Sequence, residues 1–399
     1  MIWERVKLGD VTDSCLGKML DKRKNKGTYK PYLANVNVRW GAFDLDNLQE
    51  MKFEDDEDER YGIKYGDLII CEGGEPGRCA IWKEQLPNMK IQKALHRLRV
   101  NEEMDYRYVY YWFLLAGKQG ALKQYYTGAT IMHMPGQKLK EVVIDKPPLD
   151  IQRKIGDYLE AFDDLIENNQ KQIKLLEEAA QRLYKEWFVD LRFPGYEDVK
   201  VVDGVPEGWR YKRVEEFGEV ITGKTPLTSK TEYYGGNIPF VTIPDMHGNV
   251  FPLVTEKTLT KVGADTQKNK YLPVNSVIVS CIATVGLVNI AVEACQTNQQ
   301  INSVILQNDN ELYFFYESMK RIKALLDGVG SNGATMTNVN KTKFSSIKVL
   351  YPVEDLVKRY NEFCKPIFDK ILALSKSIIK AEQARDRLLP KLMSGEIEV

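Results

Sequence analysis

The sequence predicts an α+β protein in which two similar β-rich domains are separated by two long antiparallel coiled-coil helices, related by a pseudo-twofold internal repeat. Two observations predict this. The chain of 399 residues matches itself at a shift of about 205 residues, and each copy ends in a helical pattern with the same apolar seam. The length allows two or three domains with cores of their own. We expect β-rich domains at 1–150 and 196–350, followed by helical segments at 151–195 and 351–399.

The repeat is clearest just before each long helix. The segment GATIMHMPGQKLKEVVI from Gly128 matches GATMTNVNKTKFSSIKVL from Gly333, and Pro148 or Pro352 follows. Earlier in each copy, runs such as DLIIC, IPFVTI and SVIVSCI lie between Gly, Pro and Asn, which is typical of strands and turns. Each copy also predicts an aromatic helix, DYRYVYYWFLLAG or ELYFFYESMKRIKALL, with its rings in the core.

A long helix is predicted from Ile151 to about Val189, and a second about 205 residues later. Roughly 39 residues at about 1.5 Å per residue make a rod of about 58 Å, far longer than one small domain requires. Because the helices end successive copies, a pseudo-twofold relation would lay them antiparallel; the alternative is that each docks on a different protein. Apolar residues at heptad spacing, with one Asn, predict a helix-pairing seam at Leu159, Phe162, Ile166, Asn169, Ile173, Leu176, Leu183, Ile367, Ile371, Leu374, Ile378 and Leu388.

Composition excludes several classes of protein. Lys and Arg together number 56, as do Asp and Glu, so the chain lacks the basic balance that would by itself indicate nucleic acid. The six cysteines form no C-x-x-C pair and have no histidine at metal-ligand spacing, which favours reduced thiols and no metal site. The three histidines have no matched Ser, Cys or Asp arrangement, so we expect core or loop histidines and no catalytic residue. Without a signal region or a long apolar run, a cytoplasmic protein is expected.

One segment matches a nucleotide-binding motif. GEVITGKT, from Gly218 to Thr225, fits the pattern G-x-x-x-x-G-K-[ST]. A phosphate-binding loop must leave a buried strand and enter a helix N-terminus, and neither RYKRVEEF before it nor LTSKTEYYGG after it supplies these. The matching segment of the first copy, GDVTDSCLGKM, keeps the Gly-Lys pair but has no hydroxyl after the lysine. We therefore favour a strand and turn, with a P-loop nucleotide hydrolase as the alternative.

Two similar domains on a rigid spacer suit a ligand with two separated sub-sites. Double-stranded DNA is the natural case, since half-sites on one face of the duplex recur about every 34–36 Å. Two non-identical domains would then read an asymmetric sequence. A bivalent scaffold that holds two proteins is the competing interpretation.

Four segments identify a family. They are DKPPLDIQRKIGDYL at the entrance of the first helix, AAQRLYKEWFVDLRF at its exit, GVPEGWR at the start of the second copy and RLLPKLMSGEIEV at the C-terminus. With the duplicated GAT segments, the chain resembles the specificity (S) subunits of type I restriction-modification enzymes over nearly its full length. The second helix entrance, YPVEDLVKRY, lacks the double proline and glutamine of the first.

The resemblance implies that the β-rich domains are target recognition domains, each reading one half of an asymmetric bipartite DNA site. It implies that the helices set the spacing and bind two modification (methyltransferase) subunits, which methylate adenine. Motor-nuclease (restriction) subunits would complete an ATP-dependent endonuclease. S-adenosylmethionine, ATP and Mg would lie on those partners, and this chain would be non-catalytic, as the absence of an Asn/Asp-Pro-Pro-Tyr motif also suggests.

Candidate DNA contacts are basic and amide side chains near the first strands and the GAT segments. Arg and Asn are the expected base readers, because bidentate pairing discriminates between bases by about 1–3 kcal/mol. Gln92 and the run Asn298-Gln299-Gln300 face one another in the repeat, as base readers or, as we favour, as turn-holding amides. The DNA-contact candidates are Lys18, Lys22, Arg23, Lys24, Lys26, Arg39, Lys224, Thr225, Lys230, His247, Asn338, Lys341 and Lys343.

Overall fold

The computed structural model describes residues 3–21, 25–327 and 338–399. Its internal contacts form two compact units: unit 1 contains Met1–Ile166 and Lys380–Val399, and unit 2 contains Glu167–Ile379. The sequence predicted the helices as segments separate from the domains. In the structure each long helix instead contributes residues to both units. Within the described ranges, no helix is long and apolar enough to cross a membrane.

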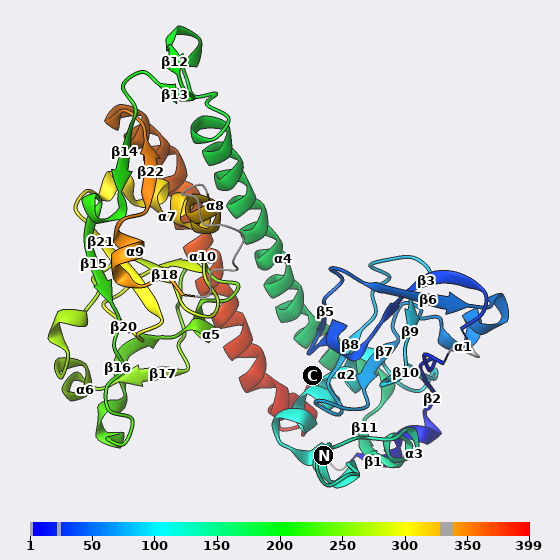
Figure 1. The fold of residues 1–399 in the computed structure, drawn as a ribbon. Helices are drawn as coiled ribbons and strands as arrows, with labels where there is room; N and C mark the ends of the chain where they lie inside the picture. The colour runs from blue at the N-terminus through cyan, green and yellow to red at the C-terminus, as the bar shows by residue number, and fades with distance from the viewer. Residues whose placement is uncertain (1–2, 22–24, 328–337) are drawn as a thin grey trace. The chain divides into compact units, whose positions relative to one another are not determined.

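Unit 1 is built mainly of short strands and ends in a long helix (Figure 1). Its elements before that helix are β1 (Glu4–Lys7), β2 (Thr12–Leu16), β3 (Thr28–Leu33), β4 (Val38–Arg39), β5 (Ala42–Phe43), β6 (Gln49–Phe53), α1 (Asp58–Tyr61), β7 (Leu68–Cys71), β8 (Cys79–Ile81), β9 (Lys90–Ile91), β10 (Leu95–Val100), α2 (Tyr106–Lys118), α3 (Gly136–Glu141) and β11 (Val143–Lys146). The long helix α4 (Leu149–Phe188) follows Pro147 and Pro148.

Unit 2 opens with a short hairpin of β12 (Val201–Val202) and β13 (Val205–Pro206) and then follows the same order. Its elements are β14 (Arg210–Arg213), β15 (Gly218–Thr222), β16 (Tyr234–Val241), α5 (Ile243–Met246), β17 (Lys257–Leu259), α6 (Lys261–Asp265), β18 (Val277–Ser280), β19 (Val288–Ile290), β20 (Gln296–Thr297), β21 (Ile301–Leu306), α7 (Leu312–Lys320), α8 (Ile322–Asp327), α9 (Lys341–Ser345), β22 (Lys348–Tyr351) and the long helix α10 (Glu354–Met393).

The two units share one topology. The four-stranded sheet of unit 1 has the order β2-β10-β7-β8, and that of unit 2 has the order β15-β21-β18-β19. A three-stranded sheet follows in each, β6-β3-β9 and β17-β16-β20, with one antiparallel and one parallel pair. The first and last strands of each repeat pair as β1-β11 and β14-β22. The match of these three sheets in order and direction confirms the internal repeat and the α+β class.

The predicted aromatic helices pack into the cores. α2 buries Tyr108, Tyr111 and Phe113, and α7 buries Phe314 and Phe315. The Phe314 and Phe315 rings meet other aromatic side chains at centroid distances of 4.8–6.4 Å, within the range of favourable aromatic pairs. The expectation that these rings form core rather than a base-stacking surface is confirmed.

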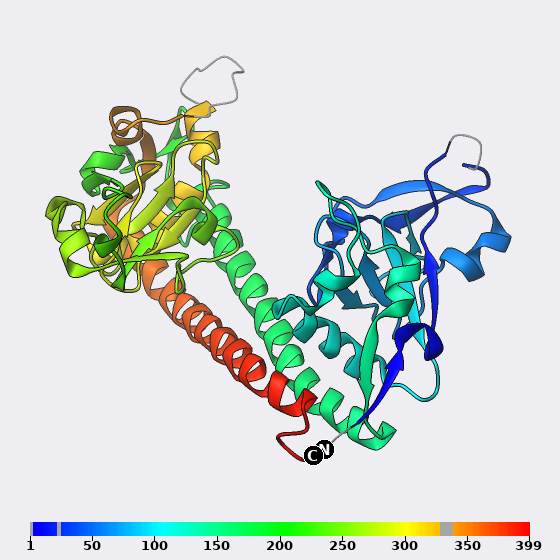
Figure 2. The same cartoon turned by 90° about the horizontal axis from the view of Figure 1, so that it is seen from below.

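In unit 2, α4 and α10 lie side by side and antiparallel (Figures 1 and 2). Asn169 Nδ2 donates to Ser377 Oγ at 3.1 Å, and Tyr360 Oη donates to the Ala180 carbonyl at 3.1 Å, so residue numbers rise along one helix as they fall along the other. Both contacts lie within unit 2. The Asn at the seam therefore finds a polar partner, which sets the register of this pair.

In unit 1, the start of α4 packs against the end of α10. Ile155 and Leu159 share a core with Leu389 and Leu392, and Arg385 Nη1 bonds Asp163 Oδ1 at 2.5 Å. Every residue of the predicted seam is buried or half-buried. The prediction missed Tyr184, Phe188 and Leu389, which are at most 6% exposed and anchor the helices to the unit cores.

Candidate nucleic-acid interface

A Gly-Lys turn follows the first strand of the four-stranded sheet in unit 1. The Gly17 N–H donates to the Leu95 carbonyl at 2.9 Å, and the Lys18 N–H donates to the Ile91 carbonyl at 3.0 Å. A Cβ added at Gly17 would lie 2.4 Å from the Gln92 carbonyl oxygen. Only glycine allows this approach of two backbones, so the residue is required by the fold.

Unit 2 repeats this turn contact for contact. The Gly223 N–H donates to Ile301 at 3.0 Å, the Lys224 N–H donates to Thr297 at 2.9 Å, and a Cβ on Gly223 would lie 2.2 Å from the Asn298 oxygen. The glycine and lysine that made GEVITGKT look like a phosphate loop are thus the counterparts of Gly17 and Lys18.

The structure gives the nucleotide alternative no support. The segment Gly218–Thr225 leaves β15 and continues without helix until the short 3-10 turn Thr231–Tyr233. A phosphate loop requires a helix N-terminus directly after the lysine, where the dipole and free N–H groups hold the anion. The strand-and-turn interpretation is therefore the one that fits.

The two turn lysines have opposite environments. Lys18 is 2% exposed; its Nζ donates to the Lys52 carbonyl at 2.9 Å, pairs with Glu57 and lies 5.0 Å from the centre of the Phe53 ring. This placement removes Lys18 from the set of side chains that can reach a ligand. Lys224 is exposed, and no partner of its ammonium is found among the described residues.

Buried amides fix the backbone of Lys224. Gln267 Nε2 donates to the Lys224 carbonyl at 2.6 Å and to Gln296 Oε1 at 2.8 Å. Thr225 Oγ1 donates to Gln299 Oε1 at 2.7 Å. The predicted contact residues Lys224 and Thr225 are therefore presented from a rigid turn.

A second pair of candidates proves equivalent. After β3, Asn37 Oδ1 accepts from the Ala34 N–H at 2.9 Å, and after β16, Asp245 Oδ2 accepts from the Thr242 N–H at 2.8 Å. Two residues beyond each cap stand the predicted contacts, Arg39 in unit 1 and His247 in unit 2. Arg39 is about half exposed, at 53% of its side chain, with an ion pair to Asp44 at 3.7 Å, and His247 is exposed.

The GAT segment of unit 1 is a tight turn. Gly128 has φ +100°, and a Cβ there would lie 2.3 Å from the Ile131 carbonyl oxygen, so this turn requires glycine. Thr130 is exposed and makes no side-chain hydrogen bond to any described residue. The second copy, Gly333 to Thr335, lies outside the described residues.

The residues after each GAT segment return to the four-stranded sheet. His133 forms a β-bridge with Gly73, and Asn338 forms the equivalent bridge with Ile282. Both His133 and Asn338 are exposed, so the two copies present different side chains at one position. The third histidine, His96, is a core residue, as the sequence indicated: it is 1% exposed, and burial lowers its pKa.

These turns are contiguous in each unit. In unit 1, the Gln92 N–H donates to the Leu33 carbonyl and the Glu72 N–H donates to the Ala94 carbonyl. In unit 2, the equivalent bonds run from the Asn298 N–H to the Val241 carbonyl and from the Cys281 N–H to the Gln300 carbonyl. We call the resulting surface the loop cluster; it comprises 17–20, 34–40, 72–78, 92–94 and 127–134 in unit 1, and 223–225, 242–248, 281–286, 298–300 and 338–340 in unit 2.

Side chains tie the unit 1 loop cluster together. Asn35 Nδ2 donates to the Gly73 carbonyl at 2.7 Å, and Arg78 Nη2 donates to the Asn35 carbonyl at 3.2 Å. Trp40 Nε1 donates to Glu75 Oε1 at 2.7 Å, and the same glutamate pairs with Arg78 at 3.1 Å. A site held this way keeps its geometry before any ligand arrives.

Among the amides that faced one another in the repeat, Asn298 and Gln300 hold a turn. The backbone pairing aligns Gln92 with Asn298, the first residue of that run. Asn298 Oδ1 accepts from the Gln300 N–H at 3.0 Å, and its Nδ2 donates to Gln300 Oε1 at 3.1 Å. The turn interpretation is confirmed for Asn298, and Gln299 stays exposed.

The remaining candidates are dispersed. Lys26 is exposed next to β3, and Lys230 is exposed with an ion pair to a neighbouring glutamate at 3.7 Å. Lys341 and Lys343 are exposed on α9, adjoining the loop cluster of unit 2. Three of the predicted contacts lie outside the described residues: Lys22, Arg23 and Lys24.

The sequence alone did not indicate a set of exposed apolar side chains on the unit 1 loop cluster. Met19, Leu20, Val36, Ile131 and Met132 are 45–71% exposed. Apolar side chains read the thymine methyl group and can enter a base step, so they suit a DNA surface as well as lysines do. The signal that identifies them is the presence of apolar residues inside otherwise polar turn segments.

The buried thiols beside this surface are unreactive. Burial raises the pKa of Cys71 and of Cys281 to about 11, so both thiols remain protonated at neutral pH. In the described part of the chain, no group of three or more His, Cys, Asp or Glu side chains is arranged to hold a metal ion.

Comparison with known proteins gives a consistent result. The chain is 34% identical over 314 residues to the type I restriction enzyme HindI specificity subunit of Haemophilus influenzae, which covers 63% of this chain and 68% of that protein. It is 29% identical to the MjaIX specificity subunit of Methanocaldococcus jannaschii, over 84% of this chain and 78% of that protein.

The fold is similar to a crystal structure of a type I restriction-modification S subunit from M. genitalium, with a TM-score of 0.60 at 15% identity, covering 98% of this chain and 96% of that one. A family model described as the type I restriction modification DNA specificity domain matches residues 2–178 and again 206–381, once on each copy of the repeat. This chain therefore belongs to the type I restriction-modification DNA specificity family, as a specificity subunit with two recognition domains.

Proposed function

We propose that each unit reads one half of an asymmetric, bipartite double-stranded DNA site through its loop cluster. We further propose that α4 and α10 set the spacing and bind two modification subunits, which methylate adenine from S-adenosylmethionine, and that restriction subunits supply the ATP- and Mg-dependent endonuclease. This chain then selects the site and leaves the chemistry to its partners.

The observation that carries this proposal is that the two units have the same backbone arrangement at the loop cluster but different side chains on it. Equivalent positions hold Arg39 and His247 after the capped turn. They hold His133 and Asn338 after the GAT segment. A shared backbone gives both units the same approach to a duplex, while different side chains give each its own sequence.

The charge of the chain is compatible with DNA binding when partner subunits supply part of the positive charge. The net charge is zero, so the chain alone neutralises few phosphates, and the partners are expected to add cations. Lys224 is the best single phosphate contact, because it is exposed on a turn that buried amides hold rigid. Arg39, His247 and Asn338 are the best base readers, since their side chains accept or donate along base edges.

The test is a map of methylated adenines in DNA from cells that express this chain with its modification partner. We expect one split motif. Arg39→Ala should relax one half of that motif and leave the other half unchanged, and His247→Ala should do the reverse, with a loss at the affected base of about 1–3 kcal/mol, or roughly 5- to 150-fold. Lys348→Ala, on β22 outside the loop cluster, is the matched control and should change neither half.

Two outcomes would contradict the proposal. If either substitution altered both halves equally, the units would not read separate half-sites. If methylation were random, or absent while the partners still assembled with the chain, the bivalent protein scaffold would be the better interpretation.

A further inference from the structure

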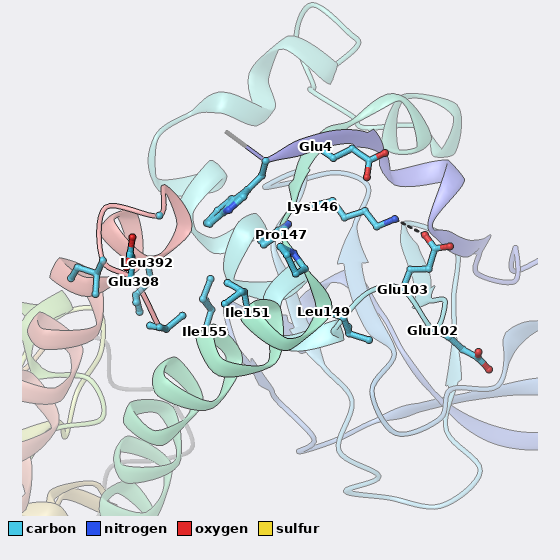
Figure 3. Close-up of a pocket in the computed structure, with 15 residues that line it drawn as sticks. Glu4, Glu102, Glu103, Lys146, Pro147, Leu149, Ile151, Ile155, Leu392 and Glu398 are labelled. Carbon is cyan, nitrogen blue, oxygen red and sulfur yellow. Dashed lines mark hydrogen bonds and ion pairs between the residues drawn. The ribbon is translucent and has the colours of Figure 1, made fainter. Parts of the chain in front are cut away.

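A cavity of about 900 Å³ lies in unit 1, away from the loop cluster, where α4 begins and α10 ends (Figure 3). Its floor is formed by Ile155 and Leu392, which are 1% and 3% exposed. Half-buried apolar side chains make its walls, namely Trp3, Leu149, Ile151, Ile397 and Val399. The interior is therefore apolar and of a size that takes one or two large side chains.

The other unit shows what such a space accepts. The strand pairing makes Trp209 the counterpart of Trp3, and the shift of the repeat makes Tyr360 the counterpart of Ile155 and Trp187 that of Leu392. In unit 2 the Trp187 and Tyr360 rings lie 6.0 Å apart.

The chain after α4 completes the aromatic cluster of unit 2. Phe193 packs on Trp209 with ring centroids 5.1 Å apart, and both side chains are at most 8% exposed. Unit 1 has Ile155 and Leu392 where unit 2 has the larger rings. Among the described residues no aromatic side chain stacks on Trp3, and the ring is approached by the backbone of Gly395, where an added Cβ would lie 3.0 Å from it. The smaller side chains account for the cavity.

The rim of the cavity is acidic. Glu4, Glu102 and Glu398 are exposed and make no ion pair within 4 Å of a described residue, but Glu4 lies near enough to Lys146 to add to the effect of Glu103 in raising the pKa of that ammonium. Lys146, the basic residue of the rim, pairs with Glu103 at 2.5 Å, which Figure 3 shows as a dashed line. Three carboxylates around an apolar opening attract a cation next to an apolar group and repel phosphate.

We propose that this cavity is a docking site for a segment of a partner protein that inserts an aromatic side chain next to an arginine or lysine. The aromatic ring would lie on Trp3, as Phe193 lies on Trp209. The basic side chain would meet the rim carboxylates. This site is independent of the DNA-reading role proposed above.

Two other classes of occupant fit less well. A small metabolite needs polar groups that converge inside the pocket, whereas the polar side chains here stand at the rim. A nucleic acid would bring phosphates toward three carboxylates. A peptide with adjoining aromatic and basic residues matches both the apolar interior and the charge.

The probe is a synthetic capped peptide, DLRFPGY, which reproduces residues 190–196, the segment that carries Arg192 and Phe193. The full-length chain is labelled with 5-fluorotryptophan, and Trp3→Phe identifies the Trp3 resonance by ¹⁹F NMR. We expect a saturable shift of the Trp3 signal alone. A peptide with Ala in place of Phe should bind at least about tenfold more weakly, because it loses the ring that fills the cavity.

Variants of the chain separate the two components of the site. Glu102→Lys and Glu398→Lys are exposed substitutions that should preserve folding and weaken peptide binding by about threefold each at low salt, with a smaller effect at high salt. Leu392→Trp copies the residue of unit 2 and should abolish binding by filling the cavity. If Leu392→Trp fails to fold, the two rim variants still decide the question.

Three results would overturn the proposal. The first is the absence of a saturable shift of the Trp3 signal up to about 5 mM peptide, since a dissociation constant above that concentration means a binding free energy of less than about 3 kcal/mol. The second is equal affinity for the Phe and Ala peptides, or unchanged affinity in both rim variants. The third is a response at Trp209 in place of Trp3, or tighter competition by a short DNA duplex than by the peptide.

Discussion

Lys18 and Lys224 stand at one position of the repeat, so replacing each by alanine should have opposite effects. Lys18 is buried, and its ammonium bonds the Lys52 carbonyl, pairs with Glu57 and lies over a phenylalanine ring. Lys224 is exposed, and its backbone alone is held by the fold. Lys18→Ala should therefore destabilise unit 1, whereas Lys224→Ala should weaken DNA binding at unchanged stability.

The magnitude follows from these contacts. Lys18→Ala leaves the Glu57 carboxylate, whose side chain is 20% exposed, without its cation. It also removes a charged hydrogen bond, of about 1.5–3 kcal/mol, and a cation–π contact of about 0.5–1 kcal/mol. Because Glu57 keeps some contact with water, we expect a total loss of about 2–4 kcal/mol, below the full cost of breaking a buried pair. For Lys224→Ala the expected change in stability is within about 0.5 kcal/mol.

Two measurements check this pair of substitutions. Hydrogen exchange reports stability separately for peptides of unit 1 and unit 2, which a single melting curve of a two-unit protein does not. DNA affinity of the complex with its modification subunit, measured against salt, should lose about 0.9 from the slope for Lys224→Ala and nothing for Lys18→Ala. The reasoning is refuted if Lys18→Ala leaves exchange in β2 and β10 unchanged, or if Lys224→Ala speeds exchange in β15.

Two further predictions concern buried charges in unit 2. Burial raises the pKa of Glu317 from its ordinary 4.5 to about 7, so the folded state binds this proton more tightly than the unfolded chain, and stability falls as pH rises from about 4.5 to 7. Relative to Glu317→Gln, the wild type should lose about 3 kcal/mol between pH 4.5 and pH 8, seen as a larger drop in thermal midpoint; equal pH profiles would contradict this. Lys212→Met should cost about 3–5 kcal/mol, because it leaves the Glu311 carboxylate, 5% exposed and bonded to Lys212 at 2.7 Å, without a cation. Adding Glu311→Gln should recover much of that loss in a double-mutant cycle, and strict additivity of the two substitutions would show that the pair is not coupled.

Much of the fold was predictable because two periodicities are repeated in the sequence. The heptad spacing located both long helices to within two or three residues of their observed starts, and the predicted strands in DLIIC and SVIVSCI are present as β7 and β18. The repeat also located the Gly-Lys turn in both copies. It did not reveal that Lys18 points inward, because Lys18 is buried by Glu57 and Phe53 from a distant segment with no counterpart signal in the local sequence.

The candidate interface was predictable in position more than in residue identity. Local sequence places Arg39 and His247 two residues beyond a capped turn, which the Asn and Asp caps alone suggest. Backbone pairing across β3 and β9, which has a long sequence separation, was needed to align Gln92 with Asn298. The division of the helices between the units likewise depends on tertiary contacts.

Equivalent residues of the two copies of the repeat can be compared, and the comparison separates residues that the fold requires from residues that are free to serve function. At Gly17 and Gly223 both copies keep glycine, because the backbone leaves no room for a Cβ. Where the copies differ on the loop cluster, the backbone tolerates either side chain, so the difference is free to encode a different half-site. The Ile155 and Tyr360 difference follows the same logic at the helix ends: one copy fills its own space with a ring, and the other leaves a space whose shape and charge define what a partner must bring.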